Sequence, residues 1–132
     1  MRIQVRTGQV LSALVLLFMT FDGVIHLLRI APVVDAFRQL GYPVTAAVPL
    51  GVIEIVCVVL FLVPATRVAA AVLLTAYFGG AIATQVRVGA DWFPVVFPVL
   101  LGGLLWGGLS FADARVRRLL TAARTAGRPA GS

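Results

Sequence analysis

The chain has 132 residues, of which 61% are hydrophobic and only 12% are charged, with a formal net charge of +6. Soluble domains carry about 25% charged and about 45–50% apolar residues, so this composition excludes an ordinary water-soluble domain and predicts a membrane protein. Every basic residue is an arginine, and nearly all lie beside the ends of apolar stretches. This placement is typical of membrane topology and argues against a nucleic-acid partner.

Four apolar segments are each close to the ~20 residues that cross a hydrocarbon core of about 30 Å. They cover residues 10–28, 46–63 and 68–85, and a last stretch that starts after Trp92 and Pro94 and ends near Phe111. The first has the basic start of a signal peptide but no small-x-small cleavage site after it, so we expect it to be a spanning helix. The predicted fold is all-α, a transmembrane four-helix bundle over residues 1–111.

Two further segments are expected to be helical outside the spans. Residues 32–42 place apolar side chains at helical spacing, which indicates a short external interfacial helix; these are Val33, Val34, Phe37 and Leu40. Residues 112–132 form a basic amphipathic tail. Its helix is expected from Ser110 onward, with one apolar face (Val116, Leu119, Leu120, Ala123) among arginines that suit anionic headgroups. Residues 127–132 are expected to be disordered.

The arginines also predict an orientation in the bilayer. Three flank one side, namely Arg29, Arg38 and Arg87, and the other eight flank the opposite side. Cytoplasmic segments of membrane proteins carry the excess of positive charge. We therefore expect a multi-pass protein of the bacterial inner membrane with its N- and C-termini in the cytoplasm.

Small residues in the third and fourth spans predict close helix packing. Gly103 and Gly107 form a GxxxG pair, and Gly79 and Gly80 lie in the third span. Glycines let helix backbones approach closely where no hydrophobic effect drives association. The pattern does not say whether the partner helix belongs to the same chain.

Ionisable residues inside the spans are the strongest sign of a site, because each costs about 2.5–3.5 kcal/mol at a helix centre. Asp22 and His26 lie in the first span and Glu54 in the second. At 1.5 Å per residue, Asp22 is roughly 9 Å and Glu54 roughly 12 Å from the same external surface. We expect a polar pocket open to the periplasmic side, in which Gln85 takes part and Arg29 or Arg87 neutralises a carboxylate.

Two interpretations of this cluster stay open. It can handle a ligand or protons, or it can serve only to fix helix register through its own hydrogen bonds. One histidine and two carboxylates make a sparse ligand set, so no metal site is predicted. No serine or cysteine has a histidine in a suitable sequence context, and no catalytic residue is assigned. Cys57 is surrounded by apolar residues and is expected to be a packed thiol.

The chain resembles the DoxX-like family of small bacterial membrane proteins. The likeness covers residues 21–118 and is carried by FDGVIHL, LGYPVTAAVPLGVIEIVCVVLFLVP, LLTAYFGGAIATQVRVGADWF and PVLLGGLLWGGLSFADARVR. It implies a four-helix inner-membrane bundle associated with quinol-oxidising redox complexes. Relatives often have a lysine at the position of His26 and a histidine at that of Gln85, whereas Glu54 matches the family pattern.

Three functions follow as hypotheses. In the first, the chain is an accessory subunit of a membrane redox complex. A quinone headgroup would accept hydrogen bonds from His26 or Gln85 while Glu54 exchanges protons, and the redox centre would belong to a partner, since no cofactor motif is present here. In the second, it is a structural scaffold for other membrane subunits or for a homo-oligomer. In the third, it transports a small molecule, although no inverted repeat supports this.

Overall fold

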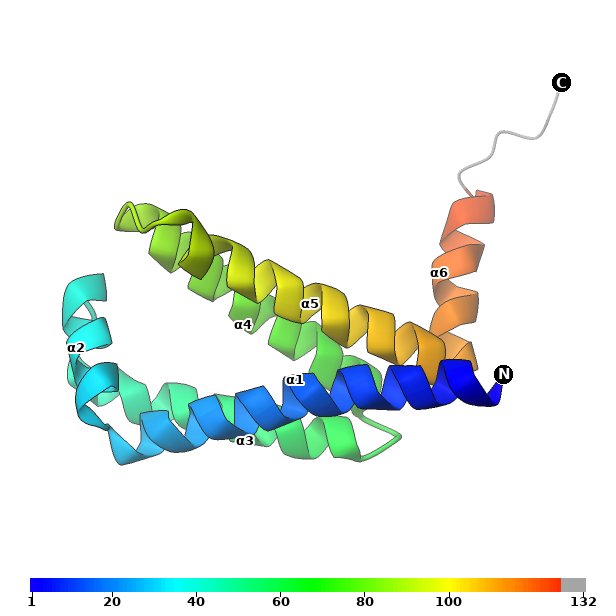
Figure 1. The fold of residues 1–132 in the computed structure, drawn as a ribbon, viewed down its shortest axis with the longest axis horizontal. Helices are drawn as coiled ribbons and strands as arrows, with labels where there is room; N and C mark the ends of the chain where they lie inside the picture. The colour runs from blue at the N-terminus through cyan, green and yellow to red at the C-terminus, as the bar shows by residue number, and fades with distance from the viewer. Residues whose placement is uncertain (127–132) are drawn as a thin grey trace, which may run out of the picture.

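The computed structural model describes residues 1–126, and this part of the chain is entirely helical between short connections (Figure 1). The elements in chain order are α1 (Arg2–Leu28), α2 (Ala31–Leu40), the 3-10 helix η1 (Val44–Ala46), α3 (Ala47–Leu62), α4 (Arg67–Arg87), α5 (Trp92–Ala112) and α6 (Ala114–Ala126). The all-α prediction is confirmed. The disorder expected for residues 127–132 lies outside the described residues.

Four helices are long and apolar enough to cross a membrane. They are α1, η1 continued by α3, α4 and α5, with mean hydropathies between 1.5 and 2.5. The four predicted spans are therefore confirmed, and the chain is a multi-pass membrane protein. Helix α1 begins earlier than its apolar run at Val10, because the polar residues before it are compatible with a helix and simply extend it past the hydrocarbon core.

The spans form a ring in which each helix packs against the spans next to it in the sequence, and the first and last spans, α1 and α5, close the ring. Helix α1 contacts α3 and α5, and α4 contacts the same two helices from the other side. Consecutive spans run in opposite directions, so the N-terminus and α6 share one end of the bundle, here called the α6 end (Figure 1). The α2 helix lies across the opposite end, here called the α2 end.

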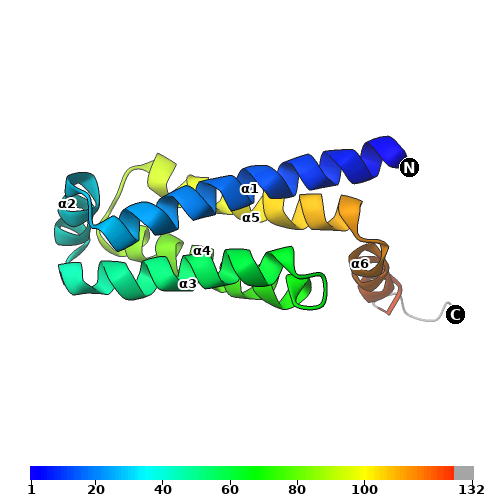
Figure 2. The same ribbon diagram turned by 90° about the horizontal axis from the view of Figure 1, so that it is seen from below.

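Helix α1 changes its closest partner along its length because of two pairs of glycines. Near the α6 end, a Cβ added to Gly8 would lie 2.5 Å from the carbonyl oxygen of Gly108 on α5. Near the α2 end, a Cβ added to Gly51 of α3 would lie 2.8 Å from the carbonyl oxygen of Gly23. Figures 1 and 2 show the result: α1 diverges from α5 toward α2 and from α3 toward the N-terminus.

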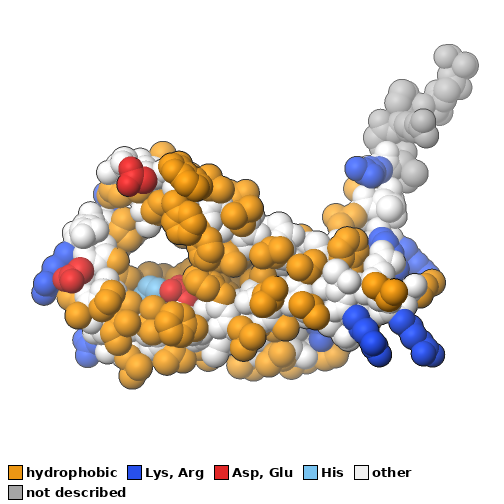
Figure 3. Space-filling view, viewed as in Figure 1, with side chains coloured by type: hydrophobic (Ala, Val, Ile, Leu, Met, Phe, Trp, Pro, Cys, Tyr) orange, Lys and Arg blue, Asp and Glu red, His pale blue; other side chains and the backbone are white. Residues whose placement is uncertain are grey.

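The core lies where the helices converge. Its fully buried side chains include Val15 and Met19 of α1, Leu74 of α4, and Leu105 and Leu109 of α5. The outer surface is mostly hydrophobic, as Figure 3 shows for one face. That surface is what a bilayer solvates, since lipid replaces water around a spanning bundle.

The glycines expected to pack helices do not meet another helix of this chain. A Cβ at Gly79, Gly80, Gly103 or Gly107 would have no neighbour within 4 Å. Close packing falls instead on Gly8, Gly23, Gly51 and Gly108. Packing by Gly79, Gly80, Gly103 and Gly107 stays a prediction, and it concerns a partner helix outside the chain.

Helix α6 turns away from α5 and runs across the bundle axis (Figure 1). The expected single helix from Ser110 is interrupted at Asp113, whose backbone is extended, so Ser110 still belongs to α5. Asp113 caps the new helix, with its Oδ1 accepting from the Arg115 backbone N–H at 2.8 Å. Hydrogen bonds from the side chain and backbone of Arg115 hold the pKa of Asp113 below its ordinary value.

The predicted apolar face of α6 is divided between two surroundings. Val116 is buried in the bundle core, whereas Leu119 and Leu120 are exposed. An amphipathic helix perpendicular to the spans has the geometry of a helix that lies in a membrane interface. Helix α2 has the same relation to the opposite end, where Val33 and Phe37 are buried against η1 and α3.

Candidate functional site

The structure brings three of the predicted polar residues together between α1 and α3. His26 Nδ1 lies 3.4 Å from Glu54 Oε1 and 3.7 Å from Asp22 Oδ2. The same nitrogen lies 2.7 Å from the Asp22 carbonyl oxygen, one turn earlier in α1. Since a carbonyl oxygen can only accept, Nδ1 carries a proton and donates in this bond. The imidazole is thus held between two carboxylates.

The glycine pair near the α2 end makes this approach feasible. Gly23 follows Asp22, and a Cβ there would lie 3.2 Å from the Cβ of Glu54. Gly51 is one turn before Glu54, and a Cβ there would lie 3.0 Å from the Cβ of His26. The sequence interpretation missed both glycines, although their positions beside the ionisable residues were a usable signal.

Tyr77 of α4 is a further member of the site that the sequence analysis missed. Its hydroxyl donates a hydrogen bond to Glu54 Oε1. Glu54 has no exposed surface, and its other oxygen, Oε2, has no hydrogen-bond partner within the described part of the chain. The signal was present, because Tyr77, Ala81 and Gln85 follow at helical i, i+4 and i+8 spacing and share one face of α4.

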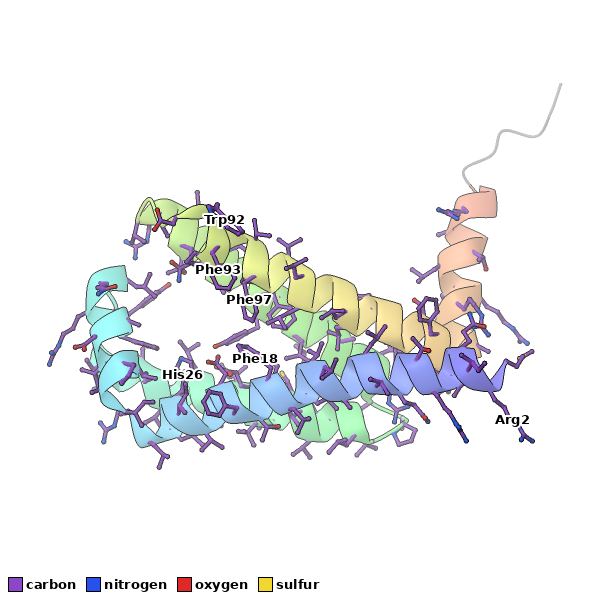
Figure 4. The ribbon with its side chains drawn as sticks, viewed as in Figure 1. Arg2, Phe18, His26, Trp92, Phe93 and Phe97 are labelled. Atoms are coloured by element: carbon purple, nitrogen blue, oxygen red, sulfur yellow. The ribbon has the colours of Figure 1, made fainter. Side chains whose placement is uncertain are left out.

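A pocket of about 290 Å³ lies beside this cluster, where α1 and α5 diverge. Phe18 of α1 and Phe93 and Phe97 of α5 face each other across it (Figure 4). The Phe18 and Phe97 ring centroids are 5.0 Å apart and those of Phe93 and Phe97 are 5.5 Å apart. Polar atoms enter the pocket from Asp22, Tyr77 and Gln85.

The space between the helices opens sideways through the wall of the bundle. In Figure 3 the single histidine and an acidic side chain beside it are visible through an opening framed by hydrophobic side chains. The opening lies between α1 and α5 at the α2 end. A ligand entering here would come from the hydrocarbon region rather than along the bundle axis.

The two arginines expected to neutralise a carboxylate are placed elsewhere. Arg29 is exposed and ends α1 in a left-handed conformation, with φ 49°. Arg87 donates to the Leu40 carbonyl oxygen and lies over the Tyr42 ring, 5.9 Å from its centroid. Arg87 therefore ties the end of α4 to the segment after α2. Among residues 1–126, the ion pairs of Asp22 and Glu54 involve only His26.

The arrangement has defined chemical capabilities. Glu54 joins Tyr77 to His26 through one carboxylate oxygen, and His26 joins Asp22, so the four side chains form a continuous polar path. Such a path within a span can hold and pass protons, or it can present oxygen and nitrogen donors to a ligand or ion.

One comparison with known proteins gives a match. The sequence profile of the DoxX-like family matches residues 10–108. That range is about three quarters of the chain; it includes the cluster, Tyr77 and the aromatic residues of the pocket, and it ends before α6. No curated protein and no solved structure matches the chain.

Proposed function

Since the chain belongs to the DoxX-like family, we propose that it is an accessory subunit of a membrane redox complex whose pocket holds a quinone headgroup. The observation that carries the proposal is the aromatic pocket between α1 and α5 with the polar path at its wall. Ligand pockets are mostly apolar, with a few convergent polar groups that fix orientation.

The size and opening of the pocket favour the headgroup of a lipid-like molecule. Ligand pockets have volumes of about 300–1,000 Å³, so about 290 Å³ suits one ring system and not a whole isoprenoid lipid. A quinone ring would lie among Phe18, Phe93 and Phe97, where offset or edge-to-face contacts stabilise aromatic neighbours. Its tail would leave through the lateral opening into the bilayer.

Hydrogen bonding to the quinone carbonyls would come from Gln85. Its side chain lines the pocket and makes no hydrogen bond within residues 1–126, so its amide N–H groups are available. Reduction of a quinone to a quinol takes up two electrons and two protons. Glu54 and His26 would exchange those protons, and the electrons would come from a redox centre in a partner protein.

The proposed orientation follows from the arginines. Eight lie at the α6 end or in α6 and the residues after it, and three lie at the α2 end. The excess assigns the α6 end to the cytoplasm and the pocket to the outer half of the bacterial inner membrane. In this orientation the exposed arginines of α6 face the anionic cytoplasmic leaflet.

The test is binding of a short-chain quinone to the full chain in nanodiscs, with two matched phenylalanine variants. Phe18 lines the pocket, whereas Phe21, less than one turn later in α1, is 63% exposed. We expect Phe18→Ala to weaken binding about tenfold, which corresponds to about 1.4 kcal/mol, and Phe21→Ala to leave it unchanged. Equal affinities for the two variants, or no saturable binding by the unaltered chain, would contradict the proposal.

A structural role toward other subunits is the second candidate, and the open glycines favour it. The four glycines of α4 and α5 named above present backbone without a neighbour in this chain. A partner helix could approach them closely. If this role is correct, Gly103→Leu releases a partner or a second copy during native mass spectrometry of nanodiscs, while Glu54→Gln keeps it. Retention of the same assembly by Gly103→Leu would argue against this role.

A further inference from the structure

The polar cluster has the dimensions of a metal centre. One donor atom each from Asp22, His26 and Glu54 can be chosen so that all lie within 4.8 Å of one another. In a tetrahedral site with bonds of about 2.0–2.1 Å, neighbouring donor atoms are about 3.4 Å apart. The distances from His26 Nδ1, 3.4 Å to Glu54 Oε1 and 3.7 Å to Asp22 Oδ2, are close to that value. A metal bound at Nδ1 would replace the proton that this nitrogen donates to the Asp22 carbonyl oxygen, since a ring nitrogen binds a metal through its lone pair.

The two carboxyl groups of the cluster share a single basic partner, His26, in the part of the chain that the structure describes. Two carboxylates meet inside a spanning bundle, and in residues 1–126 neither has an arginine partner. Ionised carboxylates at membrane depth are stabilised by pairing with a cation. Arg87 is bound to Leu40 and Tyr42, and Arg29 lies exposed beyond the end of α1. A divalent cation would balance both carboxylates at once.

A second, independent observation is the oxygen of Glu54 that has no partner. Oε2 belongs to a side chain with 0% exposure and accepts no hydrogen bond. A buried acceptor without a partner is rare in a folded protein and calls for a bound water or ion. Oε1 is already shared by Tyr77 and His26. The carboxylate therefore keeps its second oxygen free to bind an ion together with Oε1, on a side chain that is fully buried.

From these observations we propose that Asp22, His26 and Glu54 bind one first-row transition-metal dication, of the class of Zn²⁺, Mn²⁺ or Fe²⁺. Imidazole selects these ions over Mg²⁺ and Ca²⁺, which prefer oxygen ligands alone, and the absence of a sulfur ligand disfavours Cu⁺. This inference goes beyond the proposed function and does not rest on it. It also departs from the expectation drawn from the sequence, which predicted no metal site because one histidine and two carboxylates make a sparse ligand set.

The supporting residues fit a metal centre. Tyr77 donates to the Glu54 carboxylate, and outer partners of this kind orient the ligands that bind the ion. The Phe37 ring of α2 packs edge-on to His26, with centroids 5.6 Å apart, and limits rotation of the imidazole. Three protein ligands leave a position for water or for a molecule in the adjoining pocket, which Asp22 also lines.

The experiment is a metal titration of the full chain in nanodiscs after removal of metals with a chelator. Zn²⁺, Mn²⁺ and Mg²⁺ are added separately, and metal per chain is measured by elemental analysis after desalting. We expect one Zn²⁺ or Mn²⁺ per chain and no retained Mg²⁺. Co²⁺ is expected to give visible absorption bands of a low-coordinate site, which disappear in His26→Gln.

Matched variants separate the cluster from ordinary surface acids. Glu54→Gln is expected to lower Zn²⁺ affinity more than tenfold, whereas Asp35→Asn and Asp91→Asn, which alter exposed acids at the α2 end, keep it. If circular dichroism shows that Glu54→Gln does not fold, Asp22→Asn replaces it in the Zn²⁺ affinity measurement. Substoichiometric Zn²⁺ and Mn²⁺ on the unaltered chain, or equal affinities for the Asp22 and Asp35 variants, overturns the inference. Quinone binding measured in parallel shows whether the proposed function survives that outcome.

Discussion

The two ends of the bundle are built from the same kinds of helices but differ in packing. At the α6 end α1 and α5 touch through backbone atoms, since a Cβ on Gly108 would lie 2.7 Å from Ser12 Oγ and 2.9 Å from the Gly8 carbonyl oxygen. At the α2 end the same two helices are separated by aromatic rings and a pocket. The buried acid Glu54, which pairs with His26, lies in this open half.

This difference shows how a small membrane bundle combines stability with a cavity. Close contact of backbones at the α6 end supplies the van der Waals packing that holds spans together in lipid. At the α2 end the close backbone contact is between α1 and α3, and α5 lies farther from α1. The cavity therefore results from the tilt of a helix and does not require small side chains along its walls.

The largest expected effect comes from breaking the contact at the α6 end. Gly108→Leu would place a side chain where even a Cβ meets the backbone of α1, and overpacking of this kind costs about 3 kcal/mol or more. Gly107→Leu is the matched control, because a Cβ at Gly107 has no neighbour within 4 Å. Unfolding in mixed micelles, followed by circular dichroism, measures both. Equal stability of the two variants would show that α1 and α5 do not meet here.

A smaller effect on stability, but a decisive one on the site, is expected at the α2 end. Gly51→Ala would press against the Gly23 carbonyl oxygen and His26, at a cost of about 1–3 kcal/mol. The variant should remain folded while His26 and Glu54 move apart, so Zn²⁺ and quinone affinities both fall. Gly102→Ala is the control, because its Cβ would make only an ordinary contact of 3.8 Å with Phe78. Unchanged Zn²⁺ and quinone affinities in Gly51→Ala would show that the site does not depend on the packing of α1 against α3.

The smallest effect is expected outside the bundle, at the start of α6. Asp113→Ala removes a helix cap worth about 1 kcal/mol and should speed hydrogen exchange of the first α6 amides. Because the pKa of Asp113 is lowered, its ionised form stabilises the cap above its ordinary pKa range, and this stabilisation is lost as the pH falls through the lowered value. Asp35→Ala, in the middle of α2, is the control. Exchange in α6 that does not change with acidification would contradict the capping role.

Much of the fold was predictable from the sequence because span length and hydropathy are local properties. The four spans and the additional helix α2 were placed within a few residues, apart from the early start of α1. The helix pairing was not predictable. Gly103 and Gly107 match a known packing pattern but face away from the chain, whereas Gly8 and Gly108, far apart in sequence, make the contact.

The site was predictable in its ionisable residues but not in their surroundings. Asp22, His26 and Glu54 stand out because charged groups in apolar segments are costly. Arg29 and Arg87 were assigned as partners of these carboxylates by charge alone. That assignment did not predict the contacts of Arg87 with Leu40 and Tyr42. The aromatic pocket depends on the divergence of α1 and α5, a tertiary property that no single segment of sequence contains.

The length of α1 has a consequence for how the surrounding lipid acts on the molecule. Its apolar run, residues 10–28, extends about 28 Å and so nearly equals a hydrocarbon thickness of about 30 Å, while the polar turns before it extend past the hydrocarbon core. An apolar run that is longer than a thinner hydrocarbon core responds to the mismatch by tilting, and tilt is what separates α1 from α5 at the α2 end. Bilayers of short-chain lipids are thus expected to widen the pocket and those of long-chain lipids to narrow it, so that membrane thickness sets the width of the pocket between α1 and α5.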